Sequence, residues 1–576
     1  MHVVATAGHV DHGKSTLVRA LTSIDPDRLA EEKARGLTID LGFAWTQLPS
    51  GRGISFVDVP GHVRFIKNML AGVGAVDACL FVVAATEGWK PQSEEHLRIL
   101  QMLGMSNGVV ALTMAGLVDE DLAELARLDV AEHLEGTFLE EAPIIAVDSI
   151  DGTGLAELKD ALDELTATVP TSADHRRPRM WIDRVFAAKG AGTIVTGTLS
   201  GGMIRVDDEV RIEPAGVTAR VRALQSQGKD RTKVGPGNRL AINLSGVDRA
   251  ELGRGDAVVR GGQWFRTRRV DARLQVLDRL DHEVSRRGAF AMYLGSGEFP
   301  VKLRVLGDAA LLPGDTGNVR LHLEEALPLL PGDRFVLREF GRQETIGGGE
   351  ILDVDPKLSA ATARPDRDVD RVVAERGWVD ADELLLLTGE RREPSLASWV
   401  VDPAVLEAHL TATHDLVEAA GDRGVDLAQL GDRQRAAVDT FDDVVVDAGL
   451  VRLRGTTDVF ADHPYVAAVD AAPFSPPDPD DVTPDELRGL VQRGQLLQVE
   501  GRYFTPAGIS KAALELARML AEQPEGVTVS EVRERLGNTR KHAVPLMGHL
   551  DATGVTRRRG DVRVAGPRLP KVDGPT

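Results

Sequence analysis

The chain has 576 residues, a formal net charge of −20 and a single cysteine, Cys79. Its length predicts about four or more domains of roughly 150 residues each, and one cysteine excludes an intrachain disulfide, which fits a reducing compartment. No apolar run approaches the roughly 20 residues of a membrane span, so we expect a cytoplasmic protein with no membrane partner. The acidity excludes uniform nucleic-acid affinity, and any RNA contact must come from local basic patches.

The first predicted element is a buried strand, Val3 to Ala7, which leads into Gly8-His9-Val10-Asp11-His12-Gly13-Lys14-Ser15-Thr16. This is the GxxxxGK[ST] pattern of a phosphate-binding loop, placed between the strand and a helical run, Leu17 to Leu21. In such a loop, backbone N–H groups surround the phosphates, Lys14 reaches the β- and γ-phosphates, and the Ser15 hydroxyl coordinates Mg²⁺. We therefore expect the loop to bind a nucleotide; the alternative is a glycine-rich turn that binds none.

A second set of polar residues follows along the chain. The strand Ile54 to Val57 ends in Asp58-Val59-Pro60-Gly61-His62, where Asp58 is placed to hold Mg²⁺ through water and the Gly61 amide to sense a γ-phosphate. We interpret Thr38 as a threonine whose hydroxyl meets the same metal, and His62 as the residue that orients an attacking water. Taken singly, each side chain has an ordinary alternative: Asp58 could cap a turn, Thr38 could be a strand residue and His62 could be a surface histidine. Together and in this order they favour the active site of a nucleotide hydrolase.

These motifs resemble those of the translational GTPases, in which GHVDHGKST, a switch threonine and DxPGH occur together. Within that group the chain is most similar to the selenocysteine-specific elongation factors, the SelB family. The similarity is carried by RGLTIDLGF at 35–43, DVPGHVRFIKNML at 58–70 and WIDRVFAAKGAGTIVTGTLSGG at 181–202, and it extends over essentially the whole chain. The resemblance implies GTP and Mg²⁺ as cofactors, with Lys14 and His62 serving hydrolysis. It also implies an apolar gate, formed by Val10 and Leu37 around His62, that opens on the ribosome.

The element that should read guanine departs from the family pattern. After the strand Val109 to Leu112 the family has [NT]KxD, whereas this chain has Thr113-Met114-Ala115-Gly116. The missing aspartate would accept two hydrogen bonds from the base, each worth about 1.5–3 kcal/mol when charge-assisted. We therefore expect weakened discrimination among purine triphosphates.

A later loop, Val147-Asp148-Ser149, completes the predicted nucleotide contacts together with Thr113. The family places Ser-Ser or Ser-Ala where this chain has Asp148 and Ser149. Two interpretations of Asp148 stay open: it supplies the missing carboxylate from the other side of the base, or it is a solvated loop aspartate.

Changes of pattern along the chain predict its architecture, a multidomain combination of α/β, all-β and winged-helix folds. Residues 1–170 alternate apolar strands with amphipathic helices, which is typical of a parallel sheet covered on both faces and, by the resemblance, of a P-loop GTPase domain. Short, glycine-punctuated strands predict two antiparallel β-barrels, 179–262 and 263–355, with a tight turn at Gly347-Gly348-Gly349 closing the second. Short helices with β-wings then predict a winged-helix array, with repeats over 356–508 and a final winged helix over 509–576.

The final predicted domain carries the basic patch. From Arg533 to Lys571 there are ten Lys or Arg against three Asp or Glu, within a chain of net charge −20. Such segregation on a predicted helix and wing favours RNA contact over a merely solvated face. The family counterpart binds the selenocysteine insertion hairpin of mRNA, so the resemblance implies that partner. The candidate RNA-binding residues are Arg540, Lys541, Arg557, Arg558, Arg559 and Arg563.

The resemblance also implies a pocket for the aminoacyl group of selenocysteinyl-tRNA, with Asp40, Arg184 and Arg239 at the matching positions. The selenol of selenocysteine is largely ionised at neutral pH, so guanidinium groups would select it over the neutral hydroxyl of serine. The alternative for both arginines is an ordinary salt bridge between domains.

The sequence therefore predicts a GTP-dependent elongation factor that acts as a monomer. It would deliver selenocysteinyl-tRNA to the ribosome at recoded UGA codons while its last domain holds the mRNA hairpin. Two other hypotheses remain. The incomplete guanine-reading element would fit a non-hydrolysing RNA-binding adaptor derived from this family. The GTPase motifs alone would fit another translational-type GTPase, but the predicted winged-helix tail argues against that hypothesis.

Overall fold

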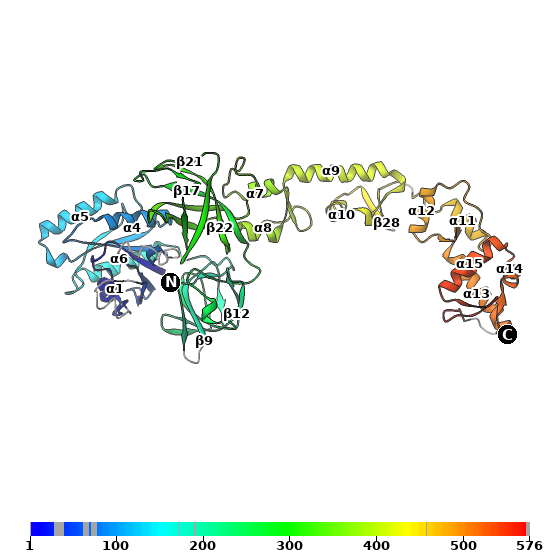
Figure 1. The fold of residues 1–576 in the computed structure, drawn as a ribbon, viewed down its shortest axis with the longest axis horizontal. Coiled ribbons are helices and arrows are strands. Elements are labelled where there is room, and N and C mark those ends of the chain that lie inside the picture. The colour runs from blue at the N-terminus through cyan, green and yellow to red at the C-terminus, as the bar shows by residue number, and fades with distance from the viewer. Residues whose placement is uncertain are drawn as a thin grey trace. The chain divides into compact units, whose positions relative to one another are not determined.

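The structure, a computed structural model, describes residues 2–27, 38, 40–61, 68–70, 76, 78–170, 172–188, 192–447, 449–456 and 458–571. The chain forms two compact units, residues 1–402 and 403–576 (Figure 1). No helix in these described ranges is both long and apolar enough to cross a membrane.

The N-terminal unit begins with a six-stranded sheet in the order β2-β3-β1-β4-β5-β6. Its strands are β1 (His2–Ala7), β2 (Gly42–Gln47), β3 (Gly53–Asp58), β4 (Ala78–Ala84), β5 (Gly108–Thr113) and β6 (Ile144–Ala146). All pairings are parallel except that of the edge strand β2 with β3. Strands β1 and β4 are buried along their whole length, as expected where a parallel sheet is covered on both faces.

Among the residues that the structure describes, helices cover both faces of this sheet (Figure 1). They are α1 (Lys14–Thr22), α4 (Pro91–Met102), α5 (Glu120–Leu134) and α6 (Leu155–Thr168). Leu17 of α1 and Leu158 of α6 pack against Val4 and Val82, whereas Leu97 of α4 and Val130 of α5 pack on the opposite face. The predicted doubly covered sheet is confirmed, and it places the loops that follow β1, β5 and β6 at one edge.

The next part of the N-terminal unit is a barrel of antiparallel strands. A ring of six strands, β11-β16-β7-β9-β15-β12, closes through the pairing of β12 with β11, so the ring itself has no free edge. The strands of this part are β7 (Arg179–Trp181), β8 (Arg184–Ala188), β9 (Gly192–Ser200), β10 (Ile204–Arg205), β11 (Glu209–Glu213), β12 (Val217–Ser226), β13 (Lys229–Arg231), β14 (Lys233–Val234), β15 (Asn238–Ser245) and β16 (Ala257–Val259). The first predicted barrel is thereby confirmed.

A second closed barrel follows, in the order β17-β22-β20-β19-β23-β24. Its strands, with a small two-stranded sheet beside them, are β17 (Arg266–Val276), β18 (Val284–Ser285), β19 (Phe290–Leu294), β20 (Gly297–Val305), β21 (Ala310–Leu311), β22 (Thr316–Pro328), β23 (Arg334–Glu339) and β24 (Glu344–Asp353). The second predicted barrel is likewise confirmed, while the exact domain limits stay predictions.

The glycine cluster of this barrel does not form the expected turn. Gly347, Gly348 and Gly349 lie inside β24, where they pair with both β17 and β23. A Cβ on Gly347 or Gly349 would overlap the carbonyl oxygen of Gln275 or Arg273, and one on Gly348 would lie 2.6 Å from the Cβ of Met102 on α4. The prediction of a turn was wrong because glycine also serves where backbones approach closely within a strand.

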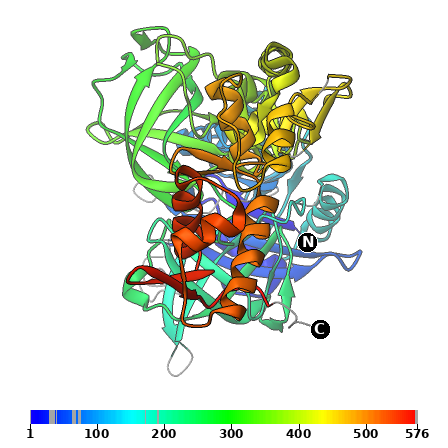
Figure 2. The ribbon, with the colours of Figure 1, turned by 90° about the vertical axis from the view of Figure 1, so that its right-hand side faces the viewer.

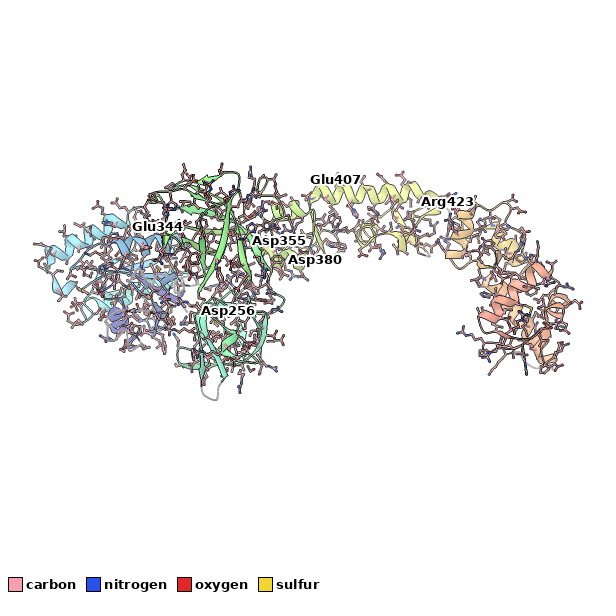
Figure 3. All side chains as sticks on the ribbon, viewed as in Figure 1. Asp256, Glu344, Asp355, Asp380, Glu407 and Arg423 are labelled. Atoms are coloured by element: carbon pink, nitrogen blue, oxygen red, sulfur yellow. The ribbon has the colours of Figure 1, made fainter. Side chains whose placement is uncertain are left out.

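The N-terminal unit ends with α7 (Val369–Arg376), β25 (Trp378–Asp380), α8 (Ala381–Thr388) and β26 (Trp399–Val401). Asp380, labelled in Figure 3, caps α8 by accepting hydrogen bonds from the Asp382 and Glu383 N–H groups. Val372 and Leu384 continue the hydrophobic core of the second barrel, so these helices are fixed to it by apolar packing.

The C-terminal unit contains repeated small sheets and helices, as predicted for a winged-helix array. Its first part comprises α9 (Pro403–Ala420), β27 (Val425–Asp426), α10 (Asp432–Val438), β28 (Val444–Asp447), β29 (Leu450–Leu453), α11 (Pro464–Ala471), α12 (Pro484–Gln492), β30 (Leu497–Val499) and β31 (Arg502–Phe504). The last part comprises α13 (Pro506–Glu522), β32 (Val527–Thr528), α14 (Val529–Leu536), α15 (Arg540–Ala552), β33 (Thr556–Arg559) and β34 (Val562–Ala565). Figure 2 shows this last part in orange and red, and its three helices and hairpin confirm the predicted winged helix.

Candidate functional site

The loop between β1 and α1 requires glycine at two places. Gly8 has a φ of 133° and Gly13 a φ of 80°, both in a region that glycine adopts without steric cost. A Cβ on Gly8 would also overlap the carbonyl oxygen of Val82. Lys14, the first residue of α1, folds back over the loop and donates hydrogen bonds to the carbonyl oxygens of Gly8 at 3.1 Å and His9 at 2.6 Å. The strand, loop and helix thus have the arrangement that the phosphate-loop pattern predicts.

Three oxygen-bearing side chains meet beside this loop. The Ser15 hydroxyl donates to Asp58 Oδ2 at 2.5 Å and lies 2.7 Å from the Thr38 hydroxyl. Thr6 donates to the other carboxylate oxygen, Oδ1, at 2.7 Å, and Thr38 to Asp27 at 3.0 Å. These hard oxygen donors fit Mg²⁺, which favours oxygen ligands and keeps several waters. The structure brings Ser15, Thr38 and Asp58 together, and it adds Thr6 and Asp27, which the motifs did not single out.

Burial shifts the two central charges in opposite directions. Burial lowers the pKa of Lys14 to about 8, although Asp58 and Asp11 favour its charged form. Burial raises the pKa of Asp58 to about 6, opposed by hydrogen bonds from Ser15 and Thr6. Both shifts express the cost of an ion in a buried place, and a phosphate beside Lys14 or a cation beside Asp58 would favour the charged forms.

The segment after Asp58 runs against the phosphate loop. A Cβ on Gly61 would lie 2.6 Å from the backbone nitrogen of Val10 and would overlap the Lys14 ammonium group, so only glycine fits there. The N–H of Val10 donates to Gln92 Oε1 at 3.2 Å. His62 and Leu37, the predicted water-orienting residue and its gate partner, lie outside the described residues.

Helix α4 and strand β5 support the loop from behind. The Gly8 N–H donates to His96 Nδ1 at 3.0 Å, and burial lowers the pKa of His96 to about 3, which keeps its imidazole neutral and able to accept. The Thr113 hydroxyl donates to the carbonyl of His12 at 2.7 Å, and burial lowers the pKa of His12 to about 4. His96 lies 88 residues from Gly8 along the chain, and no sequence motif marks it.

Methionine and glycine occupy the positions of the incomplete guanine-reading element. Met114 has a φ of 58°, and its sulfur accepts a hydrogen bond from the Thr86 hydroxyl at 3.6 Å. Its terminal methyl carbon lies 3.8 Å from the position that a Cβ on Gly13 would occupy, so the thioether lies along the phosphate loop. Asp148 is only 7% exposed, which excludes the solvated-loop interpretation of this residue. Ser149 follows it in the same loop.

The predicted aminoacyl residues lie where β2 meets the first barrel. A cavity of about 200 Å³ is lined there by Phe43, Trp45, Arg184, Phe186, Thr196 and Arg239, among others. The guanidinium carbons of Arg184 and Arg239 lie 4.7 and 3.3 Å from the centre of the Phe43 ring. Arg184 pairs with Asp40 at 3.1 Å and donates to the carbonyl of Leu41. Two arginines therefore flank one aromatic ring at the cavity wall.

Both arginines also make the salt bridges of the alternative interpretation. The pair of Arg184 and Asp40 joins the barrel to the sheet domain. Arg239 pairs with Asp183 within the same barrel. Asp183 was not among the predicted site residues, although it directly precedes Arg184.

The predicted RNA-binding residues fall into two groups. Arg557, Arg558 and Arg559 are exposed along β33, and Arg540 is exposed at the start of α15. In contrast, Lys541 lies 3.3 Å from Asp478, and the buried Arg563 lies 3.1 Å from Asp551. The first group forms the open basic surface of this domain, whereas Arg563 has a structural partner inside it.

Comparison with known proteins matches three parts of the chain to family models. Residues 1–168 match the elongation factor Tu GTP binding domain, residues 268–358 the beta-barrel domain of selenocysteine-specific elongation factor, and residues 518–565 the winged helix of elongation factor SelB.

Similar proteins span almost the whole chain. The selenocysteine-specific elongation factor of Desulfomicrobium baculatum is 31% identical over 97% of this chain and 99% of its own length. That of Escherichia coli K12 is 30% identical over 97% of this chain and 98% of its own length. The crystal structure of a bacterial selenocysteine-specific elongation factor, EF-Sec, superposes with a TM-score of 0.71 at 26% identity and covers 98% of this chain and 99% of that one.

Proposed function

The chain belongs to the family of selenocysteine-specific elongation factors, and on that premise we propose that it binds GTP with Mg²⁺ and delivers selenocysteinyl-tRNA to the ribosome at recoded UGA codons. The observation that carries the proposal is the convergence of Lys14, Ser15, Thr38 and Asp58 beside the phosphate loop. Full-length similarity that includes the SelB winged helix favours this function over another translational GTPase or a non-hydrolysing adaptor. We further propose that the protein acts as a cytoplasmic monomer.

In the proposed reaction, water attacks the γ-phosphate in line with the leaving oxygen. Lys14 neutralises charge on the β- and γ-phosphates. Ser15 and Thr38 would hold Mg²⁺ with their hydroxyl groups, Asp58 would support it with its carboxylate, and the metal would supply charge neutralisation when bound. The Gly61 amide donates to the γ-phosphate, and His62 orients the water. Val10 and Leu37 form the gate that keeps His62 away from the phosphate until the ribosome acts.

The proposed aminoacyl pocket uses Arg184 and Arg239 as counter-charges for the selenolate, with Asp40 holding Arg184. Support comes from the cavity of about 200 Å³ that both side chains line. Because Asp40 and Asp183 already pair with these arginines, their guanidinium groups are oriented before a ligand arrives. A pre-oriented cation attracts an anion without losing much side-chain freedom on binding.

We assign the tRNA backbone to a basic groove on the second barrel. A cavity of about 890 Å³ lies beside β20 and is lined by five Lys or Arg residues and one histidine against Glu283 and Asp308. The cationic residues are Arg286, Arg287, Lys302, Arg304 and Arg364, whereas burial lowers the pKa of His322 and keeps it neutral. In a chain of net charge −20, such a concentration of cations suits a phosphate backbone.

The mRNA hairpin is assigned to the last winged helix. Arg557, Arg558 and Arg559 on β33, with Arg540 on α15, would contact phosphates, and unstacked loop bases would provide selectivity. Lys541 would join them on release from Asp478, whereas Arg563 would support the wing through Asp551. The proposed domains are a GTPase domain (1–170), two barrels (179–262 and 263–355), winged-helix repeats (356–508) and an RNA-binding winged helix (509–576).

Ribosome-dependent GTP hydrolysis tests this function. The full chain is incubated with GTP, selenocysteinyl-tRNA and ribosomes programmed with an in-frame UGA followed by a selenoprotein hairpin. Turnover should rise on these ribosomes and fall when the hairpin is deleted from the message. Tight nucleotide and hairpin binding with no hydrolysis on any ribosome would instead support the adaptor hypothesis.

A further inference from the structure

The space beside Gly116 is filled by a carboxylate from another loop. A Cβ built on Gly116 would lie 2.8 Å from Oδ2 and 3.4 Å from Cγ of Asp148. Gly116 lies in a short 3₁₀ helix (Ala115–Leu117) in the connection after β5, and Asp148 lies in the loop after β6. The carboxyl group of Asp148 therefore occupies the volume into which a side chain at position 116 would project.

Asp148 is held in this place by its own loop. Its Oδ1 accepts hydrogen bonds from the N–H of Ile150 at 2.8 Å and of Asp151 at 3.4 Å. Its own N–H donates to the carbonyl of Thr153 at 2.9 Å. Among the described residues none donates a hydrogen bond to Oδ2, although the residue is only 7% exposed. One oxygen thus fixes the side chain, and the other faces the Gly116 position, ready to accept from a ligand.

The two loops are tied to each other and to the phosphate loop. The Ala115 N–H donates to the carbonyl of Val147 at 3.2 Å, and the Thr113 hydroxyl donates to the carbonyl of His12 at 2.7 Å. All three loops follow parallel strands at the same edge of the sheet, which is where ligands bind in such sheets. A nucleotide whose phosphates lie on residues 8–16 therefore has its base beside the loops that carry Gly116 and Asp148.

We propose that Asp148 is the residue that reads guanine in this protein. Its carboxylate accepts hydrogen bonds from N1–H and the 2-amino group of guanine, in place of the aspartate that Gly116 lacks. Adenine offers an acceptor at N1 and no 2-amino group, so the same carboxylate rejects it. The inference rests on the proposed use of GTP, and it replaces the expectation of weakened purine discrimination with retained discrimination from a different loop.

The first experiment compares four triphosphates on the full chain by titration calorimetry: GTP, ITP, XTP and ATP. The parent should bind GTP most tightly and ATP at least about tenfold more weakly. Asp148→Asn should weaken GTP by about tenfold or more and shift the preference towards XTP. The N–H groups of Ile150 and Asp151 hold the amide oxygen, so the amide NH₂ faces the base, where it can donate to the 2-oxo group of xanthine but meets the 2-amino donor of guanine. A gain in XTP affinity also shows that the variant is folded.

Asp151→Asn is the matched control. Its Oδ2 lies 3.6 Å from the same Cβ position, but its Oδ1 accepts from the Thr153 N–H at 2.8 Å. The ratio of GTP to XTP affinity should not change in this variant. If Asp151→Asn inverts the ratio and Asp148→Asn does not, the assignment to Asp148 is overturned.

A relocation of the carboxylate provides the second test. Gly116→Asp alone should weaken GTP binding, because two carboxylates would compete for one volume. The double variant Gly116→Asp with Asp148→Ser should recover the affinity of the parent, since one carboxylate again faces the base. If the double variant binds GTP no more tightly than Gly116→Asp, the two carboxylates do not share one volume and the proposal is contradicted.

The same titrations separate the two proposals. Equal binding of GTP and ATP by the parent would overturn the role of Asp148 and leave the phosphate site intact. Absence of binding of every triphosphate would overturn the proposed function and this inference with it.

Discussion

Arg239 donates from both arms of its guanidinium group to the carboxylate of Asp183, at 2.6 and 2.9 Å. Asp183 also accepts a hydrogen bond from the Thr196 hydroxyl at 2.6 Å, so the barrel alone fixes the direction of this arginine. Arg184 is fixed differently, by Asp40 and the carbonyl of Leu41 in the sheet domain. The guanidinium groups of Arg184 and Arg239 beside Phe43 are therefore held by two different domains. Replacing one arginine should have an effect separable from that of replacing the other.

Removal of either cation should reduce the selectivity for the aminoacyl group. We expect Arg184→Ala or Arg239→Ala to narrow the preference for selenocysteinyl-tRNA over seryl-tRNA by about tenfold, because a selenolate loses a charge-assisted contact. Dissociation constants for the two charged tRNAs, measured side by side, give the ratio. Arg260→Ala is the control, since Arg260 pairs with Asp208 in the same barrel and does not line the cavity. An unchanged ratio in both pocket variants would leave the arginines with their salt bridges as their only role.

GTP hydrolysis should depend on His62, whereas nucleotide binding should not. His62→Ala is expected to retain the GTP affinity of the parent and to lose most ribosome-stimulated hydrolysis, because the side chain acts only when water attacks. Single-turnover hydrolysis on programmed ribosomes measures the loss, and calorimetry checks binding. Undiminished turnover in the variant would mean that another group orients the water.

The affinity for Mg²⁺-bound GTP should have a maximum between about pH 6 and pH 8. Burial raises the pKa of Asp58 to about 6, so below that pH a proton competes with the metal and affinity falls. Burial lowers the pKa of Lys14 to about 8, so above that pH the side chain must gain a proton to meet the phosphate and affinity falls again. On each side of the maximum, the affinity should fall by up to about tenfold per pH unit. Calorimetry from pH 5 to pH 9 tests both limbs, and Asp58→Asn should lack the acidic one.

The wing of the last domain should contribute phosphate contacts. Replacing Arg557, Arg558 and Arg559 together by alanine should weaken binding of the mRNA hairpin and flatten its salt dependence by about 0.7–0.9 log units per lost contact. The control is Arg518→Ala with Arg535→Ala, because both arginines already pair with Glu515. Filter binding at several salt concentrations gives the slopes. Identical slopes for parent and triple variant would show that these arginines are merely solvated.

The groove on the second barrel should contribute to the binding of tRNA and not to the binding of GTP. Lys302→Ala with Arg304→Ala is expected to weaken tRNA binding whatever amino acid is attached, because phosphate contacts carry no information about the amino acid. The GTP affinity and the preference for selenocysteine should stay at parent values. A loss confined to selenocysteinyl-tRNA would be incompatible with a backbone-binding groove.

Local patterns in the sequence predicted the main elements because each has a short-range physical cause. The phosphate loop is recognised from glycines at fixed spacing. The predicted final winged helix contains α14 (Val529–Leu536), whose cap and apolar period lie within one segment. The closed barrels follow from short strands and frequent turns.

Contacts between distant residues could not be predicted in this way. His96 supports Gly8 from 88 positions away, and Arg563 is buried against Asp551 although it belongs to a basic segment. Gly347 to Gly349 looked like a turn because glycine permits both a turn and a close approach, and only the neighbouring strands decide between them. The position of Asp148 beside Gly116 depends on how two loops meet, which neither loop encodes alone.

The proposed metal site and the proposed aminoacyl cavity are separated by only a short stretch of chain. Thr38 lies 2.7 Å from the Ser15 hydroxyl, and Asp40, the partner of Arg184, comes two residues later. Two residues of extended backbone span at most about 7 Å. If Thr38 is displaced in the proposed GTP cycle when the γ-phosphate is lost, the same displacement should reach Asp40 and loosen Arg184. Release of the aminoacyl group would then be timed by phosphate cleavage, because Thr38 and Asp40 are only two residues apart along the chain.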